Sequence, residues 1–363
     1  MSAVVDRLFL EAAVTLAEQG TFSCTPNPRV GCIIVRDGVV VGRGAHLRAG
    51  EPHAEVHALR EAGPAAEGAT AYVSLEPCAH HGRTPPCADA LVAARVGRVV
   101  AAMGDPDPRV SGAGFARLRA AGIPAELLPL HQAADLNAGY VSRLRRGRPL
   151  VRVKIAQSLD GRTAMASGES RWITGPEARA DVQYWRARSC AVLTGSGTVL
   201  ADDPALTVRD DAFAVGGHIR QPLRVVADTH LRVPATAALF RGEGPVLLAH
   251  AAGAVPAVAA AEHVACGRDS VDVAALLAEL GSRGCNEVLV EAGPRLVGAF
   301  LAGGLWDELL VYVAPKLLGS DARPMAELPL LALDQAVAAT IRDFTTVGGD
   351  LRLRLIPRNP SQA

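Results

Sequence analysis

Residues 77–87 of the chain read Pro77-Cys78-Ala79-His80-His81-Gly82-Arg83-Thr84-Pro85-Pro86-Cys87, and the triplet His53-Ala54-Glu55 precedes them. One imidazole and two thiolates fill three positions around a tetrahedral zinc ion and leave the fourth for water, as in catalytic zinc sites. His53 begins a predicted helix over residues 53–62, and Cys78 follows a predicted strand over residues 71–75. The pattern therefore predicts a zinc site with His53, Cys78 and Cys87 as ligands.

The order His-x-Glu, Pro-Cys and a further cysteine is typical of zinc-dependent deaminases, in which the glutamate moves protons and is not a ligand. Bound zinc lowers the pKa of water to roughly 7, and Glu55 lies close enough to His53 along the helix to act as the proton shuttle. Taken singly, these residues could be a helix cap, a surface acid and core cysteines, but their joint occurrence favours the catalytic interpretation. A structural Cys3His zinc would leave Glu55 without a role.

Three other residues are rival zinc ligands: His80, His81 and Cys32. The two histidines lie in the insert between the cysteines and are better suited to contact the substrate. Cys32 lies within a predicted strand and is better suited to packing.

The chain has 363 residues, more than one hydrophobic core comfortably holds, which predicts two domains. Lysine plus arginine and aspartate plus glutamate both number 37, so the zero net charge gives no support to a nucleic-acid partner. The first residues lack the features of a signal peptide, and the longest apolar runs fall well short of the ~20 residues of a membrane span. Seven cysteines, an odd number, are typical of a reducing compartment. We expect a cytoplasmic protein that does not enter the membrane.

Strands alternate with helices in the first part of the chain. Helices are predicted for residues 6–19, 53–62, 89–94 and 115–121, and strands for residues 30–35, 39–42, 71–75, 98–103 and near Ile123. Asp37-Gly38 marks a hairpin turn between the first two strands. This alternation predicts a three-layer α/β domain.

A cluster of arginines around Gly147 separates the two predicted domains. It contains Arg143, Arg145, Arg146 and Arg148. We interpret it as a solvated junction, since charge runs usually face water, with a phosphate site as the alternative. The predicted domains are residues 1–147 and 148–363.

The second part of the chain also alternates between strands and helices. Strands are predicted for residues 150–156, 191–194, 223–227, 246–249, 287–291 and 308–313, an edge strand for residues 351–355, and helices for residues 177–188, 273–280 and 295–301. Gly195-Ser196-Gly197 lacks the third glycine of a dinucleotide-binding loop, so no Rossmann site is predicted. Glu291-Ala292-Gly293-Pro294 lies at a strand-to-helix turn, which either binds a cofactor phosphate or is an ordinary turn.

The residues between Cys78 and Cys87 form a longer insert than the short Pro-Cys-x-x-Cys spacing of other deaminases. This insert resembles the bifunctional deaminase/reductase family of bacterial riboflavin biosynthesis, whose motif is P-C-x-H-x-G-[RK]-T-P-P-C. Further matching segments span nearly the whole chain: Pro26-Asn27-Pro28, Asp105-Pro106-Asp107-Pro108, Ser158-Leu159-Asp160-Gly161, Ala201-Asp202-Asp203-Pro204, Val290-Glu291-Ala292-Gly293 and Ala314-Pro315-Lys316-Leu317. The resemblance implies a cytidine-deaminase-like domain followed by a dihydrofolate-reductase-like α/β domain. Ala79 and Ala292 depart from residues common in the family but remove no group that the chemistry requires.

The resemblance implies two consecutive reactions and a homo-oligomer. The first domain would hydrolyse the 2-amino group of 2,5-diamino-6-ribosylamino-4(3H)-pyrimidinone 5′-phosphate, and the second would use NADPH to reduce the ribosyl unit to ribityl. The implied deaminase contacts with this small phosphorylated pyrimidine are Asn27, His80, Arg83 and Thr84. The implied NADPH contacts are Ala156, Trp172, Thr198, Asp202, Thr229, Gly293, Pro294, Arg295, Leu296, Val297, Gly298 and Ala299. The implied reductase-substrate contacts are Lys154, Ser170, Arg186, Leu206, Arg209 and Glu291.

Two alternative functions remain open from the sequence. A single-function zinc deaminase with an inactive second domain would oxidise no NADPH. A nucleic-acid base deaminase usually displays basic and stacking surfaces, whereas this chain has no net charge and only 4% aromatic residues.

Overall fold

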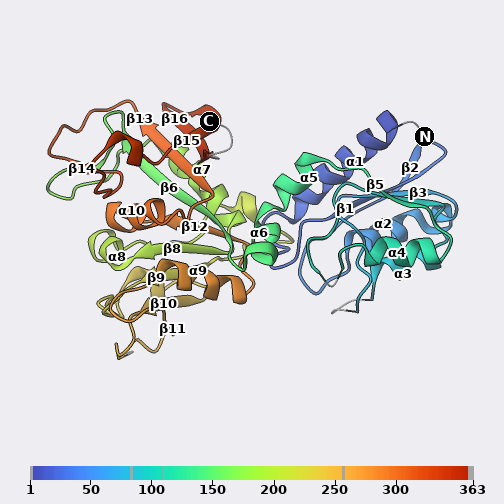
Figure 1. The fold of residues 1–363 in the computed structure, drawn as a ribbon, viewed down its shortest axis with the longest axis horizontal. Coiled ribbons are helices and arrows are strands. Elements are labelled where there is room, and N and C mark those ends of the chain that lie inside the picture. Colours follow the sequence, from blue (N-terminus) through green and yellow to red (C-terminus); the bar gives the residue numbers. More distant parts are fainter. Residues whose placement is uncertain (1–2, 82–84, 109, 256–257, 359–363) are drawn as a thin grey trace. The chain divides into compact units, whose positions relative to one another are not determined.

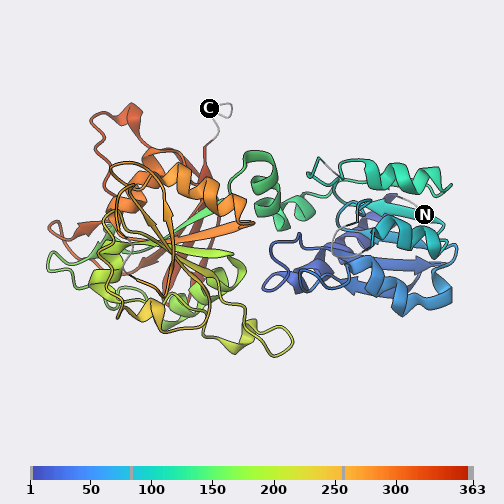
Figure 2. The ribbon, with the colours of Figure 1, turned by 90° about the horizontal axis from the view of Figure 1, so that it is seen from below.

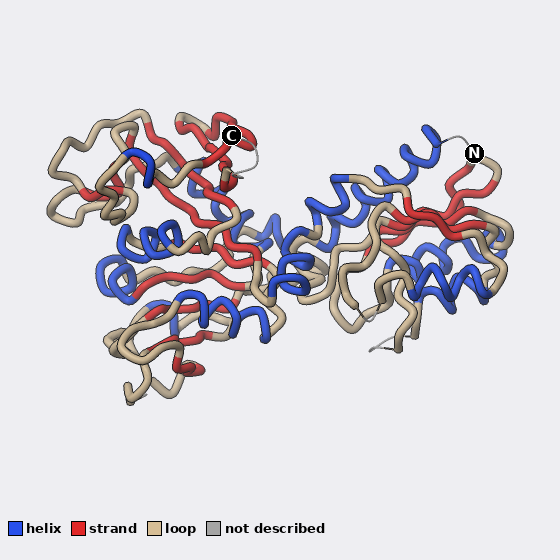
Figure 3. Tube along the Cα trace, in the orientation of Figure 1, coloured by secondary structure: helices blue, strands red, loops and turns tan. Residues whose placement is uncertain are grey.

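The computed structural model describes residues 3–81, 85–108, 110–255 and 258–358, and the chain folds as two units, Met1–Gly147 and Arg148–Ala363. Each unit contains a β-sheet that lies between layers of helices (Figures 1 and 3). Arg143, Arg145 and Arg146 occupy the last turn of α6 (Ala138–Arg146), and Gly147 ends that helix with φ 68°. The basic cluster is thus a helix C-terminus, where positive charge is favourable and glycine adopts the left-handed conformation readily.

The first unit contains a five-stranded sheet of order β2-β1-β3-β4-β5. Its strands are β1 (Gly31–Arg36), β2 (Val39–Ala45), β3 (Thr70–Val73), β4 (Arg98–Ala101) and β5 (Ala125–Leu127). β1 pairs antiparallel with β2 and β3, while β4 and β5 continue the sheet in parallel with β3. Asp37 and Gly38 both have positive φ, as a two-residue hairpin turn requires, so the predicted hairpin is confirmed.

Helices cover both faces of this sheet, which confirms the predicted three layers (Figure 1). α1 (Ala3–Ala17) and α5 (His131–Leu136) pack on one face, where Leu10 and Ala133 join a cluster with Ile33. The opposite face carries α2 (Ala54–Ala62), α3 (Cys87–Ala93) and α4 (Ala113–Ala120). The sequence pattern missed α5 and α6, which are short and bury few residues.

Two glycines of β2 allow α2 to lie directly against the sheet. A Cβ atom at Gly42 would come within 2.2 Å of the Ala58 carbonyl oxygen, and one at Gly44 within 2.0 Å of the Ala54 carbonyl oxygen. Only glycine permits backbones to approach so closely. This contact fixes the position of the helix start that carries His53 and Glu55.

The second unit is built on a nine-stranded sheet of order β11-β10-β9-β8-β12-β6-β13-β16-β15, whose strands twist across the unit (Figure 2). The strands are β6 (Leu150–Ser158), β8 (Ala191–Gly195), β9 (Leu223–Ala227), β10 (Val246–His250), β11 (Glu262–Ala265), β12 (Glu287–Glu291), β13 (Glu308–Ala314), β15 (Ala339–Val347) and β16 (Asp350–Pro357). Neighbouring strands from β11 to β13 are parallel, whereas β16 is antiparallel to both β13 and β15. A separate pair joins β7 (Arg162–Ala164) to β14 (Arg323–Pro324).

The prediction of an edge strand at residues 351–355 is wrong, because β15 pairs with the outer side of β16. β15 escaped detection because most of its residues are exposed and its sequence, ATIRDFTTV, contains few apolar side chains. Its register with β16 is set by backbone pairing rather than by burial of one face.

Helices cover both faces of the larger sheet as well. α9 (Val273–Ser282) and α10 (Pro294–Ala302) pack on one face, where Leu277 and Phe300 are fully buried. α7 (Pro176–Arg188) packs on the other face, as does Val199 of α8 (Ser196–Asp202). α7 and α10 both begin with a proline, whose fixed φ suits the first helical position. Across the described residues, every helix is too short or too polar to cross a membrane.

Candidate active sites

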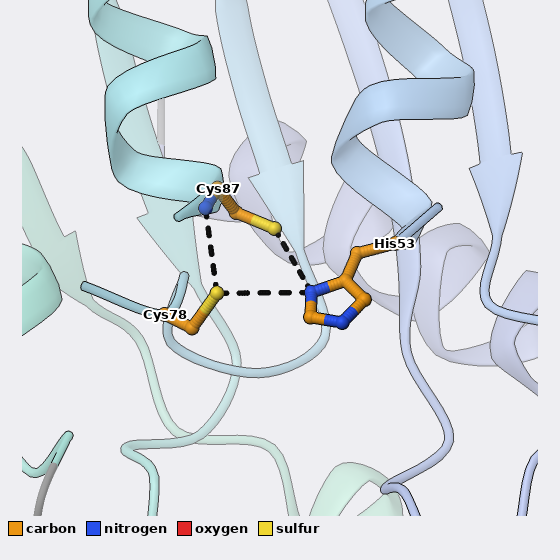
Figure 4. A group of neighbouring side chains, drawn as sticks. All are labelled: His53, Cys78 and Cys87. Atoms are coloured by element: carbon orange, nitrogen blue, oxygen red, sulfur yellow. Dashed lines mark hydrogen bonds between the residues drawn. The ribbon is translucent and has the colours of Figure 1, made fainter. Parts of the chain in front are cut away.

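Three side chains of the first unit converge as metal ligands. His53 is the N-cap of α2, Cys87 is the first residue of α3, and Cys78 lies in the loop after β3. Nδ1 of His53 lies 3.1 Å from Sγ of Cys87 and 3.7 Å from Sγ of Cys78 (Figure 4). Tetrahedral zinc, with bonds of about 2.3 Å to sulfur and about 2.0 Å to nitrogen, spaces its ligand atoms about 3.5 Å apart. The three residues therefore fit a zinc ion.

The charge state of Cys78 also suits a metal ligand. The side-chain hydrogen bond from Cys87 outweighs burial and, together with the hydrogen bond from His53, lowers the pKa of the Cys78 thiol. The backbone N–H of Cys87 donates a further hydrogen bond to Cys78 Sγ at 3.3 Å. A thiolate, rather than a thiol, binds metal, so Cys78 is held in its binding form.

Glu55 lies in the first turn of α2 and is only 2% exposed. Burial, together with the charge of Cys78, raises the pKa of its carboxyl group. Its Oε2 atom has no hydrogen-bond partner among the residues that the structure describes, and neither has Nδ1 of His80. A buried polar atom left unsatisfied costs about 1–3 kcal/mol, so both atoms point to a partner that a bound water or substrate supplies.

Asn27 is held by His46, a residue that the sequence analysis did not single out. Nδ1 of His46 lies 3.2 Å from the Pro52 carbonyl oxygen, which accepts only, so this nitrogen carries the proton. Burial lowers the pKa of His46, which keeps the ring neutral. Nε2 then accepts the hydrogen bond from Nδ2 of Asn27 at 2.9 Å and leaves Oδ1 of Asn27 for other partners. The His46 ring also packs edge-on against His53, at 5.0 Å between centroids.

The other candidates of the first unit are not among the clustered ligand atoms or lie outside the described residues. Cys32 is fully buried in β1, as its strand position predicted, and is not among the clustered ligand atoms. His81 is exposed. Arg83 and Thr84 lie outside the described residues. His46 follows directly on β2, and a titratable residue at a strand end was the sequence signal that could have found it.

The second unit brings together Lys154, Arg186 and Glu291. Glu291 ends β12 and is the register partner of Lys154 on β6, while Arg186 extends from α7. Nζ of Lys154 lies 4.0 Å from Oε2 of Glu291. Burial lowers the pKa of Lys154, and the charges of Arg186, Lys154 and Arg209 outweigh burial to lower the pKa of Glu291. Nη1 of Arg186 also donates to the carbonyl of Thr207, next to buried Leu206.

Two further contacts join predicted residues of the second unit. Oγ of Ser170 donates to Oδ1 of Asp202 at 3.5 Å. Gly293, the N-cap of α10, donates its N–H to Oγ1 of Thr198 on α8 at 3.2 Å. The starts of α8 and α10 are therefore neighbours, and Pro294, Arg295, Leu296, Val297, Gly298 and Ala299 follow in α10.

Three other predicted cofactor contacts, Trp172, Thr229 and Ala156, lie beside residues other than those described above. Trp172 is 63% exposed, with the guanidinium of Arg179 stacked 4.4 Å from its ring. Thr229 follows β9, and its Oγ1 accepts from Val271 at 3.4 Å. Ala156 lies in β6, paired with Tyr312 of β13.

Comparison with known proteins decides the family. Residues 149–352 match the RibD C-terminal domain, and residues 4–103 match the cytidine and deoxycytidylate deaminase zinc-binding region. Over 97% of its length the chain is 50% identical to the riboflavin biosynthesis protein RibD of Escherichia coli (strain K12), of which it covers 99%. The chain belongs to the RibD family.

Further RibD relatives agree over the full length. RibD of Haemophilus influenzae is 46% identical over 97% of this chain and 98% of its own. The solved structure of Acinetobacter baumannii RibD, form 1, matches with a TM-score of 0.93 at 45% identity, covering 99% of this chain and 100% of that one. A deaminase/reductase structure from Thermotoga maritima matches with a TM-score of 0.88 at 29% identity, covering 98% of this chain and 99% of that one.

Membership of the RibD family confirms the predicted fold class and the two-activity interpretation. The chain is a bifunctional enzyme of riboflavin biosynthesis, with a cytidine-deaminase-like zinc domain followed by a reductase domain. The cluster of His53, Cys78 and Cys87 falls in the deaminase domain, and the cluster of Lys154, Arg186 and Glu291 in the reductase domain.

Proposed function

We propose that the chain first deaminates 2,5-diamino-6-ribosylamino-4(3H)-pyrimidinone 5′-phosphate and then reduces the ribosyl unit of the product with NADPH. The Thermotoga maritima relative is described as a diaminohydroxyphosphoribosylaminopyrimidine deaminase and 5-amino-6-(5-phosphoribosylamino)uracil reductase, which supports this substrate and this order. The match over the whole chain favours this proposal over a single-function deaminase or a nucleic-acid base deaminase.

In the deaminase step, His53, Cys78 and Cys87 would hold zinc. A zinc ion held in this way supplies a Lewis acid at its open fourth position and makes water a nucleophile near neutral pH. The oxygen of water bonds to C2 of the pyrimidine, and the bond from C2 to the amino group breaks. Glu55 would take the protons of the water at its Oε2 atom and pass one to the ring nitrogen and one to the departing ammonia. Asn27 and His80 orient the ring. The contact of Asn27 with His46 uses its Nδ2 atom, so its Oδ1 atom is left for the substrate.

In the reductase step, Lys154, Arg186, Glu291 and Arg209 would bind the opened ribosyl phosphate, with Ser170 and Leu206 beside it. NADPH would supply a hydride to C1′ of the opened sugar, and a proton added to the attached nitrogen would complete the ribityl group. The turn that begins with Gly293 presents backbone N–H groups at the start of α10, a position that favours a cofactor phosphate. Ala156, Trp172, Thr198, Asp202 and Thr229 complete the proposed cofactor site.

The observation that carries the deaminase proposal is the presence, beside three zinc-compatible ligand atoms, of the buried carboxyl group of Glu55, whose Oε2 atom has no partner among the described residues. The test supplies the diaminopyrimidinone phosphate with and without NADPH and follows ammonia and NADPH absorbance separately. We expect ammonia in both cases and NADPH oxidation only after deamination. When a chelator removes the metal, both signals should be lost, and NADPH oxidation alone should return when the deaminated intermediate is supplied. Ammonia release that survives complete zinc removal would contradict the proposal.

We further propose that the chain forms a homo-oligomer through the second unit and works in the cytoplasm. β15 is the last strand of its sheet, and its Phe344 and Ile341 side chains are 69% and 57% exposed. Leu331 and Leu333, in the segment before β15, are 92% and 91% exposed. Exposed apolar residues on the last strand of a sheet favour pairing with a second copy. Sedimentation of a Phe344→Lys variant at a smaller mass than the wild type would support this interface.

A further inference from the structure

Glu76 is a buried carboxylate that neither proposed reaction uses. It is 3% exposed and stands two residues before Cys78. Its Oε2 atom accepts from the N–H groups of Asp105 at 3.3 Å and Gly112 at 3.0 Å, and its Oε1 atom accepts from Gly114 at 3.0 Å and Phe115 at 3.3 Å. Four backbone donors on one carboxylate tie the loop before α4, and the first turn of that helix, to the segment of the zinc ligand.

The contact between the two segments continues beyond Glu76. A Cβ atom at Gly114 would lie 1.9 Å from the carbonyl oxygen of Pro77, so the first turn of α4 lies directly against Pro77. The N–H of Glu76 donates to the Met103 carbonyl oxygen at 2.8 Å, just beyond β4, and the Cys78 carbonyl oxygen accepts from Ala88 of α3 at 3.1 Å. The residues on both sides of Pro77 are therefore fixed by backbone contacts.

We propose that Glu76 is a positioning residue for the deaminase, because its carboxylate fixes residues 76–78 against the start of α4 and so sets the place of Cys78 relative to His53 and Cys87. The proposal rests on the zinc site described above. A negative charge at the N-terminus of α4 is also favourable to the helix dipole. Glutamine at this position keeps one acceptor oxygen but turns an NH2 group toward two N–H donors, so that two of the four bonds are lost.

The test compares Glu76→Gln with the wild type and with Glu67→Gln. Glu67 is an exposed carboxylate of the same unit whose partner is Arg95. Zinc affinity is measured by competition with a chromophoric chelator, and ligand geometry by the visible spectrum of the cobalt(II)-loaded enzyme. The kcat of ammonia release and the rate of NADPH oxidation with the deaminated intermediate are measured on the same samples.

We expect Glu76→Gln to hold zinc about 10- to 100-fold more weakly, to shift the cobalt spectrum and to lower the kcat of ammonia release. NADPH oxidation should be unchanged, and Glu67→Gln should behave as the wild type. A purely structural role would lower stability without moving the spectrum of the folded enzyme. A folded Glu76→Gln enzyme with wild-type zinc affinity and spectrum overturns the proposal.

Gly114→Ala provides a second variant if Glu76→Gln does not fold. The added Cβ displaces the same segment at Pro77 without substitution of Glu76. Unchanged zinc affinity and an unchanged cobalt spectrum in this variant likewise overturn the proposal. Both readouts are independent of substrate. A wild type that binds zinc but releases no ammonia would contradict the proposed function and leave the test of Glu76 valid.

Discussion

Arg186 and Glu291 form a two-bond ion pair that joins α7 to the end of β12. Nε of Arg186 lies 2.5 Å from Oε1 of Glu291, and Nη2 lies 3.0 Å from Oε2. Their side chains are only 13% and 11% exposed, and Lys154 adds a second positive charge at 4.0 Å. The two buried cations are stabilised only while the carboxylate between them carries its negative charge.

Glu291→Gln should destabilise the second unit by about 3–5 kcal/mol, because Arg186 and Lys154 stay buried without a counter-charge. It should also abolish NADPH oxidation while ammonia release continues. All three tryptophans, Trp172, Trp185 and Trp306, lie in this unit, so tryptophan fluorescence during urea unfolding measures its free energy of unfolding. Glu327→Gln, which breaks only an exposed pair with Arg295, is the control. An unchanged free energy of unfolding for Glu291→Gln would refute the prediction.

Glu55→Gln should lower the kcat of ammonia release by about 10²- to 10⁴-fold, the usual contribution of a general acid–base group. Zinc content should stay at the wild-type level, because Glu55 is not among the clustered ligand residues. Glu61→Gln changes an exposed carboxylate on the same helix and should have little effect. Deamination that persists in Glu55→Gln would reject the proton-shuttle role.

His46→Ala should raise the KM of the deaminase for its pyrimidine about tenfold, the equivalent of one lost hydrogen bond of about 1.4 kcal/mol. The amide of Asn27 loses the acceptor that fixes its orientation, and the ring of His53 loses its edge-on neighbour. Steady-state kinetics of ammonia release measures this change, with NADPH oxidation as the internal control. A wild-type KM would show that His46 does not orient Asn27.

Stability of the first unit should depend on pH through Asp105. Burial raises the pKa of Asp105 to about 6, above its ordinary value of 3.8. The folded state therefore binds more protons than the unfolded state between about pH 4 and pH 6, and this carboxyl group makes stability fall as pH rises through that window. Asp105→Asn keeps the oxygen that accepts from Asp107 and Tyr140 and removes the titration.

Hydrogen exchange of peptides from the first unit, compared between wild type and Asp105→Asn across this window, measures the effect of Asp105. As pH rises from 4 to 6, the free energy of unfolding of the variant should increase relative to that of the wild type by about 2 kcal/mol. Other groups titrate equally in both proteins and cancel in the difference. A constant difference across the window would contradict the assigned pKa.

The chemistry of the zinc site and the alternation of helices and strands could be predicted from local sequence patterns. His53, Cys78 and Cys87 carry distinctive donor atoms, and their side chains converge in the structure. Patterns of apolar residues likewise predicted β6, in which they alternate with Arg152 and Lys154. They also predicted β8 and β12, because strands covered on both faces read as continuous apolar runs. β15 left no such pattern, because its register comes from backbone pairing with β16.

Which polar side chains meet depends on how the strands pair and the helices pack. The contact between His46 and Asn27 joins residues 19 positions apart, and the one between Arg186 and Glu291 joins residues 105 positions apart. The same holds for Glu76, whose four donors lie on a loop and a helix that follow β4. Local sequence encodes secondary structure through periodicity, whereas such hydrogen bonds depend on how strands pair and helices pack. The pairing of these residues therefore carries no local signal, even where one of them, such as His46 at the end of β2, can be singled out by its position.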